Sequence, residues 1–194
     1  MRKERLRLYL PEEYHESIFE VDFVSHISSG RNIIFFDLDN TIEDYDHYTP
    51  SEKVIELFKR LKRLGYDIIF ISNNGKKRLK NFTYILEVKS LTHVRKPFTF
   101  KIKKYLKYSN YNVNNILFIG DQIVTDIKFS RKLGIYSILV KPINRKSEKW
   151  YTKINRFFEN IKLKQIKKIL PNEYKNLGLD RKGWANLYVG DVDP

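Results

Sequence analysis

Short apolar runs alternate with amphipathic segments along most of this chain. The runs at residues 33–36, 68–71 and 116–119 contain only Ile, Leu and Phe, and a further strand-like run follows at 136–140. A short apolar run suits a strand that is buried on both faces of a parallel sheet. The alternation of such strands with helices predicts an α/β fold, in which a doubly wound parallel sheet lies between two layers of helices.

Local signals predict where several helices begin and end. Thr49 has the properties of an N-cap and Pro50 those of a first helical residue, and Gly65 is expected to end the same helix. Pro11 is likewise expected to open a short helix, and Pro97 a helix that carries Phe98 through Leu106, because proline is favoured at the first helical position. These boundaries leave the ends of the apolar strands joined to helices by loops rich in polar residues.

Residues 144–170 form a basic amphipathic stretch. Its large apolar residues are expected to share one face of a helix: Trp150, Ile154, Phe157, Phe158 and Ile161. A helix of this kind either docks on the core or lies on an anionic membrane surface. We favour docking, with the lysines solvated and available to attract an anionic surface.

These patterns divide the chain into successive parts. Residues 1–30 are expected to form an N-terminal segment, 31–145 the core, 146–170 the docked basic helix and 171–194 a tail. The pattern assigns the tail no function. A chain of 194 residues with 42% hydrophobic residues can bury one substantial core, so we expect a single domain with appendages.

Composition restricts the chemistry and the location. The chain has no cysteine, which excludes disulfides and thiolate nucleophiles. No apolar run approaches the ~18 residues of a membrane span, and no signal-peptide core follows the N-terminus. We therefore expect a cytoplasmic protein that contacts a membrane at most peripherally.

The net charge of +14 indicates an anionic partner. A membrane surface, a nucleic acid and a phosphorylated substrate all fit. A biased genome that favours Lys, Ile, Asn and Tyr would produce the same charge without any such partner. Charge alone leaves these alternatives open.

Asp37 and Asp39 directly follow the first apolar run. Ligands in open α/β sheets bind just beyond the carboxyl ends of the strands. Two neighbouring carboxylates repel each other, so a divalent cation or a shared proton is needed to compensate them. The alternative is structural, since Asp-x-Asp pairs also occur in helix caps and Asx turns.

Polar residues with complementary chemistry follow the other predicted strands. Ser72-Asn73-Asn74 ends the second apolar run, and its amides and hydroxyl suit a phosphate. Lys96 lies beyond a weaker strand, while Asp121 and Asp126 follow the third apolar run. Parallel strands would bring these residues to one edge of the sheet, where together they provide the groups that phosphoryl transfer requires.

Phosphate-monoester hydrolysis needs several such groups, because enzymes accelerate it by up to ~10²¹-fold. Asp37 would act as the nucleophile, and Asp39 as the general acid and base. Mg²⁺ would be bound by carboxylates, and the phosphoryl oxygens by polar and cationic groups. The expected metal ligands are Asp37, Asp121 and Asp126, and the expected phosphate-binding residues are Ser72, Asn73 and Lys96.

Four of these segments, in order, resemble the motifs of the haloacid dehalogenase superfamily: Asp37-Leu38-Asp39-Asn40-Thr41, Ser72-Asn73-Asn74, Lys96-Pro97 and Gly120-Asp121 through Asp126. The chain is more closely similar to the YqeG-type subgroup of the class IIIA phosphatases, also at residues 11–19 and 152–156. This resemblance implies a Rossmann-like sheet, Mg²⁺ dependence and an aspartyl-phosphate intermediate. It also implies that the main-chain carbonyl of Asp39 joins the metal shell.

The spacing of the motifs predicts that there is no cap domain. About thirty residues separate Thr41 from Ser72 and about twenty separate Asn74 from Lys96, and one helix accounts for much of each interval. In the superfamily that the chain resembles, capless members act on large or surface-bound phosphates. Phosphatidylglycerophosphate, a substrate of relatives of the subgroup, is therefore our favoured substrate. The alternatives are nucleic-acid ends, a phosphoprotein, or a non-enzymatic module that binds RNA or the ribosome.

Overall fold

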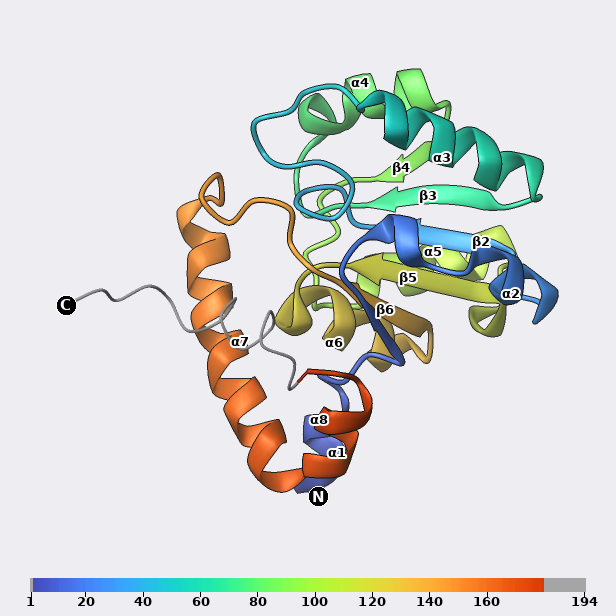
Figure 1. Cartoon of the computed structure of the whole chain (residues 1–194). Coiled ribbons are helices and arrows are strands. Elements are labelled where there is room, and N and C mark those ends of the chain that lie inside the picture. The colour runs from blue at the N-terminus through green and yellow to red at the C-terminus, as the bar shows by residue number, and fades with distance from the viewer. Residues whose placement is uncertain (1, 180–194) are drawn as a thin grey trace.

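The computed structural model describes residues 2–179. Its centre is a six-stranded sheet in the order β1-β6-β5-β2-β3-β4, and every pair of neighbouring strands is parallel (Figure 1). The strands are β1 (Glu13–His15), β2 (Ile33–Phe36), β3 (Asp67–Ile71), β4 (Lys89–Leu91), β5 (Ile116–Gly120) and β6 (Tyr136–Val140). The predicted α/β fold with a parallel sheet is confirmed.

Helices cover both faces of the sheet. Helices α2, α3 and α4 pack on one face, and α5 and α6 pack on the other. The helices are α1 (Arg2–Arg7), α2 (Phe23–Ser28), α3 (Glu52–Arg63), α4 (Lys76–Leu86), α5 (Phe100–Ser109), α6 (Lys128–Leu133), α7 (Trp150–Ile169) and α8 (Pro171–Asn176). Shorter turns are η1 (Ile18–Glu20) and η2 (Val113–Asn115), and η3 (Ile123–Ile127) is a π-helix.

The central strands are aligned at their carboxyl ends. Phe36 of β2 pairs with Phe70 of β3 and with Ile119 of β5. All four residues of β2 and all five of β5 are buried, as expected for strands covered on both faces. The segments that leave β2, β3 and β5 therefore begin at nearly the same level, and the predicted site residues lie in those segments.

Three predicted helix starts are wrong. Helix α3 begins at Glu52 after Ser51, because the carboxylate of Glu43 accepts a hydrogen bond from the Ser51 N–H (2.7 Å) and replaces the predicted cap. No helix begins at Pro11; the chain instead forms β1, which pairs with β6. After Pro97 the chain makes a turn, and α5 begins at Phe100. In each case a tertiary contact or a turn takes precedence over the local proline signal.

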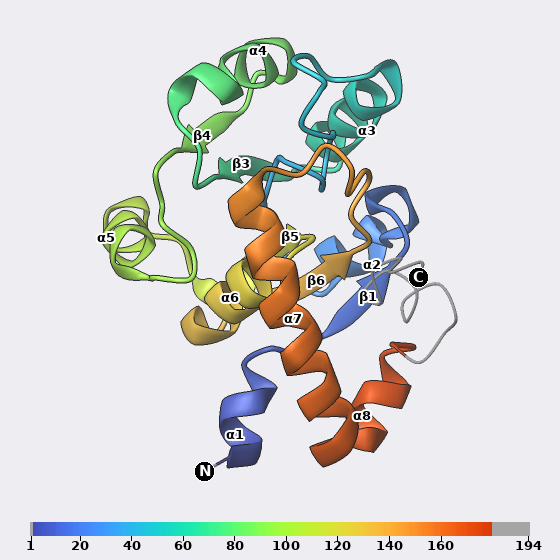
Figure 2. The same ribbon diagram turned by 90° about the vertical axis from the view of Figure 1, so that its left-hand side faces the viewer.

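Helix α7 lies beyond the carboxyl ends of the strands and is nearest the viewer in Figure 2. The prediction that α7 docks by its apolar face is wrong. Its buried residues are Thr152, Arg156, Glu159, Leu163 and Ile166, whereas the predicted apolar face is exposed. The second half of α7 packs with α1 and α8 in a separate apolar cluster.

The segment predicted as a tail begins with a helix. Helix α8 directly follows α7, and residues 180–194 lie outside the described part of the chain. Between β2 and Lys96 the described chain contains only loops, α3, β3, α4 and β4, in agreement with the prediction of no cap domain. Within residues 2–179, no helix combines the length and apolar character needed to span a bilayer.

Candidate active site

Asp37 directly follows β2, the strand predicted from the first apolar run. Its N–H donates to the carbonyl of Ile119 (2.9 Å), so the backbone ladder with β5 continues one residue past the strand and fixes Asp37 in place. The Nζ of Lys96 lies 2.5 Å from Asp37 Oδ1 and 2.7 Å from Asp126 Oδ1. The structure therefore joins three of the predicted site residues through one buried ammonium group.

Asp37, Asp121 and Asp126 form a compact group of carboxylates. One oxygen from each lies within 4.8 Å of the others, and all three residues are buried. Burial raises the pKa of Asp37 well above its ordinary value; Lys96 opposes this shift, and Asp126 adds to it. Buried carboxylate oxygens that share so little space are suitable ligands for a hard divalent cation, which would offset their repulsion. The donor set fits Mg²⁺.

Gly120 permits this close arrangement. A Cβ built on Gly120 would lie 2.6 Å from the Cβ and from Oδ2 of Asp126, closer than real side chains approach each other. Asp126 belongs to the π-helix η3, and its carboxylate accepts a hydrogen bond from the Gln122 N–H (3.1 Å). Single π turns inside helices are frequent at functional sites. Here the π turn, together with glycine at position 120, brings Asp126 next to β5.

Asp39 is not part of the cluster formed by Asp37, Asp121 and Asp126, although Asp39 and Asp37 line one cavity. Its carboxylate accepts hydrogen bonds from Asn74 Nδ2 (2.6 Å) and Arg78 Nε (2.7 Å). Arg78 also donates to the carbonyl of Asp44 (2.8 Å), which fixes the guanidinium. Asp39 is thus oriented by two donors from the β3–α4 region, and its side chain is not part of the cluster formed by Asp37, Asp121 and Asp126.

Arg78 was not recognised in the sequence. It lies on the first turn of α4, three residues after the cap residue Gly75, among several other basic residues. Its position just beyond the end of β3 was the available signal. In a chain with 37 Lys and Arg residues, that signal did not distinguish it from solvated cations.

Ser72 and Asn73 have different roles in the structure. Ser72 Oγ accepts a hydrogen bond from the Asn74 N–H (3.0 Å), and the residue lines the cavity. The side chain of Asn73 is bound to the main chain of Lys96, accepting from its N–H (2.6 Å) and donating to its carbonyl (3.2 Å). Asn73 therefore fixes the backbone that carries Lys96.

Arg156 of α7 is the second residue that sequence reasoning missed. Its buried guanidinium pairs with the Asp121 carboxylate, and also bonds the Asp121 carbonyl (2.9 Å), Glu148 (2.7 Å) and Glu159 (2.9 Å). Burial raises the pKa of Asp121 to about 7, against the lowering effect of Arg156. In the sequence, the only sign that Arg156 is functional was the family similarity at residues 152–156. The hydrophobic pattern of the helix placed Arg156 among the solvated basic residues.

A small cavity of about 60 Å³ is lined by both Asp37 and Asp39. This volume is a few times the ~10–15 Å³ that one water molecule needs, so the cavity can hold a small group such as a phosphoryl. Its other lining residues are Tyr45, Ser72, Asn73, Asn74, Lys96, Gln122, Thr125, Asp126, Tyr151, Thr152 and Asn155. The predicted site residues from four separate segments therefore meet at one place, except that Asp121 lies behind this surface.

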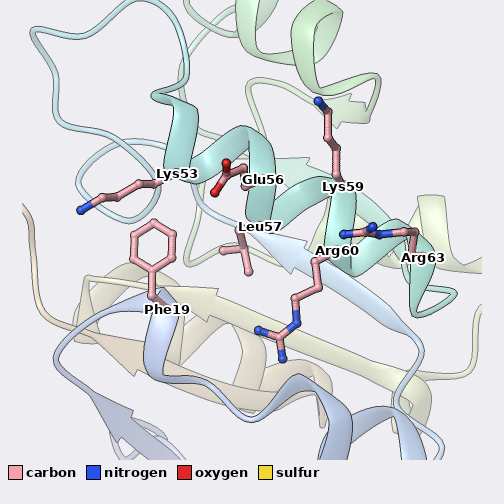
Figure 3. A pocket seen from close by; sticks show the side chains of 7 residues that line it. All are labelled: Phe19, Lys53, Glu56, Leu57, Lys59, Arg60 and Arg63. Carbon is pink, nitrogen blue, oxygen red and sulfur yellow. The ribbon is translucent and has the colours of Figure 1, made fainter.

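A larger groove of about 500 Å³ lies along α3 (Figure 3). The side chains of Lys53 and Arg60 flank Phe19 there, and Glu56 is the one carboxylate among its lining residues. A single carboxylate among several cations provides neither a nucleophile paired with an acid nor a metal-ligand set. We therefore place the candidate active site in the smaller cavity.

Comparisons with known proteins identify the family of this chain. Residues 3–134 match the family model of the haloacid dehalogenase-like hydrolases. The chain is 29% identical over 164 residues to "Probable phosphatase YqeG" of Bacillus subtilis, covering 84% of this chain and 94% of that protein.

Solved structures give weaker matches. An uncharacterized protein from Listeria monocytogenes aligns with a TM-score of 0.47 at 15% identity, over 59% of this chain and 84% of that one. A protein from Streptomyces avermitilis, whose crystal structure is titled "putative HAD family hydrolase", aligns with a TM-score of 0.46 at 11% identity, over 58% of this chain and 72% of that one. The family match covers most of this chain and includes the strands that carry Asp37, Ser72 and Asp121. The predicted resemblance is confirmed, and the chain belongs to the haloacid dehalogenase-like hydrolase family.

Proposed function

We propose that this hydrolase is a Mg²⁺-dependent phosphatase of phosphomonoesters that acts through an aspartyl-phosphate on Asp37. One observation carries the proposal: Asp37 shares Lys96 with Asp126, and its carboxylate lies within a group of three buried acids. The name of the Bacillus subtilis relative, which describes a phosphatase, supports the same activity. A purely structural role would not require so many buried carboxylates in contact with one another.

In the first step, an oxygen of Asp37 attacks phosphorus and the bond to the leaving oxygen breaks. Asp39 donates a proton to that oxygen, and then accepts one from the water that attacks the aspartyl-phosphate. Release of inorganic phosphate restores the Asp37 carboxylate. Asn74 and Arg78 hold the Asp39 side chain at the cavity. The carboxyl group is therefore already oriented before either proton transfer.

Lys96 stabilises the negative charge of the phosphoryl group during its transfer. Burial lowers the pKa of its ammonium group, but Asp126 and Asp37 raise it by more, so the net shift is upward and Lys96 stays charged. Asn73 fixes its backbone, and Ser72 provides a hydroxyl at the same wall of the cavity. A preorganised cation and hydroxyl of this kind lower the energy of a transition state that gains negative charge.

Asp37, Asp121 and Asp126 would hold Mg²⁺, together with the main-chain carbonyl of Asp39. When bound, Mg²⁺ offsets the negative charge of the carboxylates and of the phosphoryl oxygens. Arg156 holds the Asp121 carboxylate from the opposite side. The protein thereby keeps this ligand in position before the metal binds.

Metal binding is expected to stabilise the fold. Mg²⁺ at about 100 times its dissociation constant contributes ~2.7 kcal/mol to a protein that binds it only when folded. For a chain of this size the melting temperature should rise by about 5–10 °C. Differential scanning fluorimetry with and without Mg²⁺ measures the shift, and Asp126→Asn should remove most of it. A wild-type melting temperature that does not respond to Mg²⁺ would contradict the assigned ligands.

The substrate is proposed to be bulky or membrane-bound, such as phosphatidylglycerophosphate. The cavity is small and of a size for a phosphoryl group, and the described chain places no cap domain over it. The remainder of the substrate must therefore lie outside, against an open rim. A phosphate that projects from a membrane or from a macromolecule meets this requirement, and the +14 charge favours an anionic surface around it.

A panel of phosphomonoesters tests the proposal. We expect hydrolysis of an aryl phosphate that is lost with EDTA, and the highest kcat/KM for phosphatidylglycerophosphate in vesicles. A 5′-phosphorylated oligonucleotide and a phosphopeptide should be poorer substrates. Absence of Mg²⁺-dependent hydrolysis throughout the panel would refute the phosphatase assignment. A preference for the oligonucleotide or the peptide would refute only the choice of substrate.

A further inference from the structure

Helix α7 exposes an unusual number of large apolar side chains. Trp150 is 73% exposed, Phe157 62% and Phe158 51%. Ile154 (47%) and Ile161 (36%) lie between and beyond them on the same helix. At 100° per residue these five residues fall within an arc of about 100°. They form one continuous stripe, here called the α7 stripe, on the helix that lies nearest the viewer in Figure 2.

The charged side chains that α7 exposes are all positive. Glu159 is the one acidic residue of α7, and it is buried in its ion pair with Arg156. The exposed lysines of the helix are Lys153, Lys164, Lys167 and Lys168. Aromatic and aliphatic residues flanked by lysines, without exposed acids, are the signature of a helix that lies in a membrane interface.

The buried side of α7 explains why the stripe faces outward. Thr152 and Arg156 are directed into the protein, where Thr152 bonds Tyr45 (3.1 Å) and Arg156 holds Asp121. These polar contacts fix the rotation of the helix, so its largest apolar residues cannot turn toward the core. Within the described residues, nothing else packs over the stripe to reduce its exposure.

The same helix also borders the active site. Tyr151, Thr152 and Asn155 line the catalytic cavity. On a helical projection Tyr151 lies between the α7 stripe and the cavity-lining side. A flat surface that contacted the stripe would therefore come close to the rim of the cavity, where the remainder of a bulky substrate must lie.

We propose that the α7 stripe docks this protein on an anionic lipid membrane. The stripe would enter the interface, and the flanking lysines would contact lipid phosphates. A second copy of the chain fits less well, because two lysine-bearing faces repel and α7 offers no exposed acid to pair with them. The inference rests on the proposed function, since docking places the cavity against a surface that presents phosphomonoesters.

Vesicle cosedimentation of the full chain tests the inference. The probes are vesicles of phosphatidylcholine with 30% phosphatidylglycerol and vesicles of phosphatidylcholine alone. We expect binding to the anionic vesicles, and at least a tenfold loss of affinity in Phe157→Glu. The matched control is Tyr84→Glu on α4, which adds the same charge at a side chain that is 84% exposed and should change the affinity less than twofold. Both variants should hydrolyse a soluble aryl phosphate as the wild type does.

Each further outcome is decisive. The inference is overturned if the wild type does not bind anionic vesicles, or if both variants lose the same amount of vesicle affinity. If the protein still hydrolyses the soluble phosphate in that case, the proposed function stands. A dimer in light scattering that Phe157→Glu dissociates, without vesicle binding, overturns it in favour of a second copy. Vesicle binding that depends on Phe157 in a chain with no phosphatase activity supports the docking surface and overturns the proposed function.

Discussion

Replacement of Arg156 by methionine is expected to lower the free energy of unfolding by roughly 3–5 kcal/mol, the usual cost of breaking a buried ion pair by removing one partner. The Arg156 side chain is only 2% exposed, and its partners Asp121, Glu148 and Glu159 are equally buried. Methionine fills much of the same volume but leaves these carboxylates facing one another. Urea unfolding monitored by circular dichroism measures the change.

Two further variants make this test specific. Arg156→Lys keeps the charge but cannot supply the planar fork that bonds Asp121 and both glutamates, so its loss should be smaller. Arg63→Met removes an exposed arginine from α3 and should change stability by less than about 0.5 kcal/mol. If Arg156→Met unfolds at the same urea concentration as the wild type, the buried network does not stabilise the fold as we infer.

The second large effect concerns catalysis. Asp39→Asn should lower kcat by about 10²–10⁴-fold, the range that a general acid or base contributes. The affinity for Mg²⁺ should stay nearly the same, because the Asp39 carboxylate binds Asn74 and Arg78 and lies outside the three proposed metal-ligand carboxylates. Steady-state kinetics and a Mg²⁺ titration by fluorimetry separate these two effects.

The time course of the Asp39→Asn reaction adds a qualitative check. An aryl phosphate has a good leaving group that needs little help from a general acid, so transfer to Asp37 should remain fast. Hydrolysis of the aspartyl-phosphate needs a base and should be slow. A burst of one aryl alcohol per protein, followed by slow turnover, is therefore expected. An unchanged rate in Asp39→Asn would rule out its role in proton transfer.

The pattern of short apolar runs was sufficient to predict the sheet and the meeting point of its strand ends. Strands β2 and β6 have the predicted bounds, and Asp37, Ser72 and Asp121 follow three neighbouring strands. Parallel strands that are buried on both faces have a strong and local signal. Because their carboxyl ends lie at one edge, the grouping of the polar residues that follow them could be derived without coordinates.

The ion pairs within the site could not be derived in this way. Arg78 and Arg156 are single cations in basic helices, and the site carboxylates that they bind, Asp39 and Asp121, lie far away in sequence. The partner of a charge depends on tertiary geometry, which no local pattern records. Sequence reasoning therefore predicted the acids, which follow strands, but missed the arginines that hold them.

Helix α7 shows how a polar network can override an apolar pattern. An amphipathic helix normally buries its apolar face, and this rule predicted the wrong side of α7. The contacts of Arg156 and Glu159 instead direct the polar side inward, at the edge of the active site. Exceptions of this kind are expected where a site, rather than the core, determines packing.

The central claim is that Asp37 is the nucleophile of a Mg²⁺-dependent phosphatase. The most direct test compares the hydrolysis of an aryl phosphate by the wild type and by Asp37→Asn, with circular dichroism to show that both are folded. We predict Mg²⁺-dependent turnover by the wild type and a loss of at least about 10³-fold in the variant. A folded wild type without activity, or equal rates in the two proteins, would contradict the claim.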